Sequence, residues 1–193
     1  MKKINTVKGM LFAVAAMFAL TTVASAGVLN NVYLEVGSSA VGVIAEGTSN
    51  DAASATTTGA VGKTEITADY GLGYMTNRDR KMGIDVGYII TPGQAKISHT
   101  SNSASATSVS LDVSDMTQYY IAPMINITED ASLYVKLARN STDLTVVGDV
   151  NKITSMDGDT IAVGTVMSWG SNLYMRTEAG QTEYDTLKFT GLG

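Results

Sequence analysis

The sequence contains no cysteine, one histidine, two prolines and one tryptophan in 193 residues. Without cysteine, the chain has neither a disulfide scaffold nor a thiolate metal site. Lysine and arginine number 13 against 18 acidic residues, and an acidic chain with scattered cations is a poor nucleic-acid binder. The sequence also lacks a glycine-rich phosphate loop and a His/Cys cluster with metal-ligand spacing. We therefore expect no cofactor.

One apolar run lies at the N-terminus. Lys2 and Lys3 precede the apolar stretch Met10–Leu20, and Ala24–Ala26 reads Ala-Ser-Ala, an A-x-A cleavage signal. This pattern predicts a secretory signal peptide over residues 1–26 and a mature domain over residues 27–193. The run is too short for a stable membrane span, and no later run of eighteen apolar residues follows it.

From Asn31 onward, the chain alternates apolar and polar residues with period two. The apolar side is the continuous one, and the other side carries glycines, small polar residues and isolated charges. A soluble β-protein hides its apolar face, whereas a barrel in lipid turns that face outward. The pattern therefore predicts an all-β fold, an antiparallel up-and-down transmembrane β-barrel. A soluble β-sandwich is the competing fold, since it also shows alternation and regular turns.

Seven strands can be counted, and their connections alternate between long and short. Three long connections are rich in polar residues, namely Gly47–Gly62, His99–Ser108 and Asp149–Asp159. Long loops on one rim and tight turns on the other are typical of outer-membrane barrels. The expected strands are Asn31–Glu46, Lys63–Met75, Met82–Ile90, Leu111–Asn126, Leu133–Ala138, Ile161–Trp169 and Leu173–Glu178.

The alternation also assigns charged and aromatic side chains to faces. A barrel of about eight strands is just filled by side chains, which favours a plugged interior over a narrow porin-like channel. Aromatic residues near strand ends are expected to form a girdle at the lipid–water boundary. The charges expected inside are Glu35, Asp69, Asp85, Lys136, Arg176 and Glu178; the expected girdle is Tyr70, Tyr74, Tyr88, Tyr119 and Trp169.

Two hairpins carry a resemblance to a known family. Ile127–Lys136 ends one strand, turns through Thr-Glu-Asp and opens the next with an aromatic residue, and Ser168–Glu178 repeats the theme. With Thr182–Asp185, these segments resemble the OmpA-like or opacity-type small outer-membrane barrels. The resemblance implies a location in the bacterial outer membrane, with lipid, lipopolysaccharide and the outer-membrane assembly machinery as partners. It further implies a structural or surface-interaction role.

The family resemblance implies eight strands, of which the last ends in an aromatic residue. Only seven are counted here, and the sequence stops at Phe189–Gly193. An open sheet would leave unpaired backbone groups in lipid, which is very costly. Either the sequence ends before the eighth strand, or a strand is hidden near the extension Val41–Ala45.

An enzymatic function is the third alternative. His99–Asn102 reads H-T-S-N and resembles the H-x-S-N element of outer-membrane lipid A deacylases, in which Ser101 would be the nucleophile and His99 the base. The downstream glutamate of that family is missing, with only Asp112 or Asp115 nearby. Because the surrounding segment is rich in Ser, Thr and Asn, we expect a loop histidine and no enzyme. Asp157–Asp159 reads Asp-Gly-Asp, which turn chemistry explains better than a calcium site.

Overall fold

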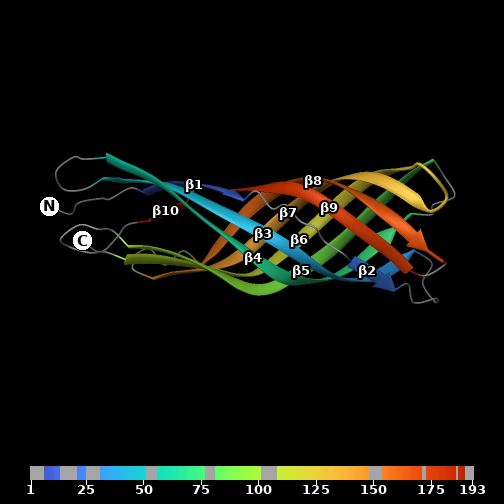
Figure 1. Cartoon of the computed structure of the whole chain (residues 1–193), viewed down its shortest axis with the longest axis horizontal. Coiled ribbons are helices and arrows are strands. Elements are labelled where there is room, and N and C mark those ends of the chain that lie inside the picture. Colours follow the sequence, from blue (N-terminus) through green and yellow to red (C-terminus); the bar gives the residue numbers. More distant parts are fainter. Residues whose placement is uncertain are drawn as a thin grey trace.

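A computed structural model shows that the chain is all-β (Figure 1). The structure describes residues 7–13, 21–24, 31–50, 56–76, 81–100, 108–147, 154–170, 173–185 and 187–189. Among these residues, no helix is long and apolar enough to cross a membrane. The strands are β1 (Val7–Ala13), β2 (Thr21–Ala24), β3 (Val32–Asn50), β4 (Thr56–Met75), β5 (Met82–Thr100), β6 (Ser108–Asn126), β7 (Ala131–Val147), β8 (Ser155–Trp169), β9 (Leu173–Tyr184) and β10 (Leu187–Phe189).

The seven long strands β3 to β9 form one sheet in which every strand pairs with its neighbours in the chain. All of these pairings are antiparallel, from β3–β4 through β8–β9, so the topology is a simple up-and-down meander. The sheet curls about the long axis of the molecule (Figure 1). The predicted all-β, antiparallel up-and-down barrel architecture is thus confirmed. A sandwich would need two packed sheets, whereas the long strands belong to one.

The gap between the first and last long strands is bridged by the N-terminal segment. β2 pairs with β3 and with β9, and β1 does the same further along. An odd number of alternating strands makes β3 and β9 run in the same direction, so they cannot join antiparallel without a strand between them. The pairings of β1 and β2 therefore complete a ring of hydrogen-bonded strands. These residues fall within the predicted signal peptide, whose removal remains a prediction.

The long loops predicted from the sequence were wrong in their limits, because the strands extend into them. Much of Gly47–Gly62 belongs to β3 and β4, which pair as far as Asn50↔Thr56. His99 and Thr100 lie in β5, and the last part of Asp149–Asp159 lies in β8. A paired backbone ladder satisfies its own hydrogen bonds and continues through small polar residues that give no apolar signal. The tight turn at Thr128–Ala131 was predicted more closely, since Ile127 N donates to Ala131 O at 2.9 Å.

Alternation sends the two faces of each strand to opposite surroundings. In β8, exposed and buried residues alternate almost without interruption. The outward face is apolar: Ile66 is 78% exposed, Val163 59% and Trp169 71%. The inward face carries the polar and charged residues that a soluble protein would place in water. This inside-out distribution is the arrangement that the sequence pattern predicts.

Glycines on neighbouring strands leave the space that the inward tyrosine rings occupy. Tyr33 lies directly across from Gly73, and Tyr120 directly across from Gly87. A Cβ at Gly87 would stand 2.6 Å from Tyr120 Oη and 2.7 Å from two ring carbons, so only glycine leaves room for the ring. Two more tyrosines lie directly across from a glycine in the same way, Tyr134 from Gly164 and Tyr184 from Gly158. An aromatic ring covering a glycine on the next strand also helps to hold the register of the two strands.

Candidate functional site: the charged interior

The structure places all six predicted interior charges inside the curled sheet. Each of these side chains is at most 6% exposed, and Asp85 is completely buried. They come from β3, β4, β5, β7 and β9, so strands far apart in the chain meet at one site. The six residues are Glu35, Asp69, Asp85, Lys136, Arg176 and Glu178.

Arg176 on β9 is the centre of this group. Its guanidinium forms an ion pair with Asp85, and its Nη2 donates to Tyr33 Oη at 3.0 Å. Its Nη1 donates to Tyr120 Oη at 3.2 Å. The guanidinium carbon also lies 5.2 Å from the ring centre of Tyr134, within cation–π range. A buried cation with this many partners connects its own strand, β9, to four other strands through one side chain.

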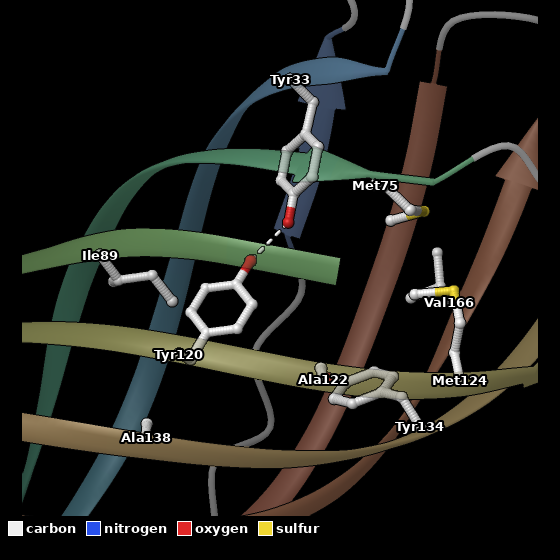
Figure 2. Close-up of a cluster of buried hydrophobic side chains, with 9 residues drawn as sticks. All are labelled: Tyr33, Met75, Ile89, Tyr120, Ala122, Met124, Tyr134, Ala138 and Val166. Atoms are coloured by element: carbon white, nitrogen blue, oxygen red, sulfur yellow. Dashed lines mark hydrogen bonds between the residues drawn. The ribbon is translucent and has the colours of Figure 1, made fainter. Parts of the chain in front are cut away.

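Figure 2 shows how the tyrosines meet within the buried cluster. The hydroxyls of Tyr33 and Tyr120 point toward each other and form a hydrogen bond. Tyr33 Oη also donates to Asp85 Oδ1 at 2.7 Å. Toward the short-turn end, the cluster is apolar and is formed by Met75, Met124 and Val166. The interior is therefore a polar layer backed by a packed apolar plug.

Lys136 and Glu178 form a second buried ion pair, in which both side chains are 3% exposed. Lys136 Nζ also donates to Gln118 Oε1 at 2.8 Å, and Tyr134 Oη donates to Glu178 Oε2 at 2.7 Å. Gln118 continues the network through its Nε2, which donates to Asn140 Oδ1 at 2.7 Å. Every member named here has a partner, as a buried network requires.

The interior holds more carboxylates than cations. Among the residues that the structure describes, the buried charged side chains are four carboxylates and two cations, a net charge of −2 when all are ionised. Asp85 and Glu178 each pair closely with a cation. Glu35 lies 3.6 Å from Arg176 through its Oε2, and that oxygen has no hydrogen-bond partner among the described residues. Asp69 accepts hydrogen bonds from the hydroxyls of Ser39 and Thr91.

The predicted girdle residues lie on the outer face. Tyr70, Tyr74, Tyr119 and Trp169 are all at least 43% exposed. Tyr74 and Trp169 lie at strand ends beside the short turns, as expected. The ring centres of Tyr88 and Tyr119 lie 4.6 Å apart, and the two residues are direct register partners. They lie well inside β5 and β6, because those strands extend further than the apolar pattern indicated.

The catalytic candidates are not brought together by any described contact. His99 pairs through its backbone with Val109 in the β5–β6 ladder, so it is a strand residue and the expected loop position was wrong. Ser101 and Asn102 lie outside the described residues. Asp157 and Asp159 flank Arg139 on the outer face, with the Arg139–Asp159 contact at 3.0 Å. Among the described residues, no group of three or more His, Cys, Asp or Glu is placed to hold a metal ion.

The sequence interpretation missed the tyrosines that organise the interior. Tyr33, Tyr120 and Tyr134 supply the hydroxyls and ring faces around Arg176. A signal was present, because an inward tyrosine needs an inward glycine on the neighbouring strand. That signal can be read only once the strand register is known.

Comparison with known proteins gives no relative: no family model, no curated protein and no solved structure matches this chain.

Proposed function

We propose that this protein is a small bacterial outer-membrane β-barrel with a structural and surface-interaction role. The observation that carries the proposal is the inverted sheet, apolar outside and charged inside. Such an outer face is unfavourable in water but suits hydrocarbon, and the paired backbone satisfies its own hydrogen bonds. The partners on this proposal are outer-membrane lipid and lipopolysaccharide, and the assembly machinery that inserts such barrels.

The height of the apolar band supports the proposal. On β5 the outward face is apolar from Met82 to Ile90, and on β4 from Tyr74 to Ile66. Eight residue steps at a rise of about 3.4 Å cover roughly 27 Å along a strand. A tilt of roughly 40° reduces this to about 20 Å of height, close to the ~25 Å band of outer-membrane barrels.

The outer face changes character toward the end opposite the short turns. Leu137 and Ile161 are cross-strand partners in the apolar band. One alternation further on, Arg139 pairs with Asp159, which pairs with Glu183, and all three are exposed. A row of charged side chains at this level marks the end of the part that suits hydrocarbon. The strand ends beyond it would project from the membrane and form the interaction surface.

The interior favours a filled barrel over a channel. The largest side chains that point inward pack against one another, and Met124 and Val166 are at most 2% exposed. Arg176 is instead paired with Asp85, and Lys136 is paired with Glu178, which also accepts a hydrogen bond from Tyr134. A barrel of this size is expected to be filled by its own side chains.

A heat-dependent gel shift tests the proposal. The protein is expressed in a Gram-negative host, and the cells are separated into soluble, inner-membrane and outer-membrane fractions. Each fraction is run on an SDS gel both unheated and boiled. We expect the protein in the outer-membrane fraction and a different migration before and after boiling, because a closed barrel with its ladder intact resists SDS. Recovery as a soluble protein without a heat shift would contradict the proposal.

Export through a cleaved signal peptide has its own measurement. We expect the intact mass of the protein from the outer-membrane fraction to correspond to a chain beginning at Gly27, because Ala24–Ala26 is an A-x-A site. Cleavage would remove β1 and β2 with their pairings to β3 and β9, so a heat shift of the exported form would show that another strand closes the ring. A mass that retains residues 1–26 would contradict the cleavage and make these residues a permanent part of the ring.

A further inference from the structure

One buried carboxylate in the interior lacks a cation. Asp69 is 5% exposed and forms no ion pair within the described residues. Its two oxygens accept hydrogen bonds from Ser39 and from Thr91, the latter at 2.7 Å. Hydroxyl donors solvate a carboxylate without neutralising it. A buried unpaired charge is costly, so a compensating positive charge is expected nearby.

A second carboxylate with spare capacity lies beside it. Glu35 on β3 has a side chain that is 4% exposed, and its Oε2 has no hydrogen-bond donor among the described residues. Among the described residues, its one cation contact is with Arg176, whose Nη1 lies 3.6 Å from Glu35 Oε2, and Arg176 forms its closer ion pair with Asp85. In the β3–β4 ladder Asp69 faces Gly37 and Glu35 faces Gly71, so the two carboxylates are diagonal neighbours on the inner face.

Both carboxylates line a cavity of about 20 Å³. This volume accommodates one water-sized species and no more. Ser39 and Thr91 add hydroxyl oxygens to the lining. Lys136, Arg176 and Glu178 also border it, but Lys136 is paired with Glu178 and Arg176 with Asp85.

We propose that this cavity binds one largely dehydrated monovalent cation of the size of Na⁺, held by the carboxylates of Glu35 and Asp69. Hard cations prefer oxygen ligands, which the carboxylates and the two hydroxyls supply. Mg²⁺ keeps several of its waters and is too large with them for this volume. Lys136 and Arg176 also border the cavity and would repel a divalent cation more strongly than a monovalent one. The inference goes beyond the proposed function, and it holds whatever surrounds the outer face.

The test measures the thermal unfolding of the purified protein in a zwitterionic detergent by circular dichroism. Na⁺ is exchanged against choline at constant ionic strength and pH. Above the dissociation constant, each tenfold rise in Na⁺ should raise the Tm by roughly 3–6 °C, because a ligand that binds only the folded state stabilises it. Glu35→Gln and Asp69→Asn should each flatten this dependence. Asp159→Asn, which removes an exposed carboxylate on the outer face, should keep the wild-type dependence.

Three results would overturn the inference. One is a Tm of the wild-type protein that does not respond to Na⁺, and another is an equal response in wild type and Asp69→Asn. The third comes from infrared spectroscopy of the wild type in Na⁺: a protonated carboxyl band that Asp69→Asn removes would show that a proton neutralises the site. Line broadening of the ²³Na resonance by the wild-type protein, reversed by Li⁺, gives a readout that does not require the variants to fold.

Discussion

Replacing Arg176 by leucine should cost the fold about 3–5 kcal/mol, because the substitution leaves buried carboxylates without their cation. Arg176 is 3% exposed and is paired with Asp85 and with Glu35. It also donates to the hydroxyls of Tyr33 on β3 and Tyr120 on β6, so its loss breaks the hydrogen bonds that connect β9 to both strands. The measurement is the urea concentration at which the heat-modifiable form disappears in detergent micelles.

The matched control is the same substitution at Arg139. That side chain is 53% exposed, and its ion pairs with Asp157 and Asp159 lie on the outer face. Exposed ion pairs contribute little, so Arg139→Leu should unfold at the wild-type urea concentration within error. Adding Asp85→Asn to Arg176→Leu should recover part of the loss, because the stranded carboxylate is then gone. Equal tolerance of the two arginine substitutions would contradict the central role given to Arg176.

Gly87→Ala should destabilise the barrel by about 1–3 kcal/mol through overpacking. The new Cβ would stand 2.6 Å from Tyr120 Oη. Tyr120 is held in place, since Arg176 donates to its hydroxyl at 3.2 Å and its hydroxyl lies 3.3 Å from Asp85 Oδ2. The ring therefore cannot move aside without giving up these partners. The same urea titration measures the loss.

A double-mutant cycle separates this clash from other effects of the substitution. Tyr120→Leu removes the ring, so Gly87→Ala should cost much less in that background than in the wild type. Gly71→Ala is a graded control, because its Cβ would meet its nearest neighbours only at 3.2–3.3 Å. Additive effects of Gly87→Ala and Tyr120→Leu would show that the ring is not what excludes a side chain at this position.

Most of what could be predicted about the architecture came from the alternation of apolar and polar residues along each strand. A period of two fixes which residues share a face of a strand, whatever the strand pairs with. The inward placement of the six charges, and the apolar outer face, both follow from that period. The strand limits did not follow, because the Gly/Ala/Ser/Thr-rich ends of β3 and β4 pair through their backbones and carry no apolar signal.

The sequence by itself therefore determined the class of fold and the side of the sheet on which each charge lies, since both depend only on neighbours along the chain. The tertiary structure alone decided the partners. Arg176 meets Tyr33 across 143 residues of sequence, and Lys136 meets Glu178 from a strand that is not its neighbour. Such contacts depend on the register of the strands and the curl of the sheet, which arise from all seven long strands together. For the same reason, the cavity between Glu35 and Asp69 became visible only in three dimensions.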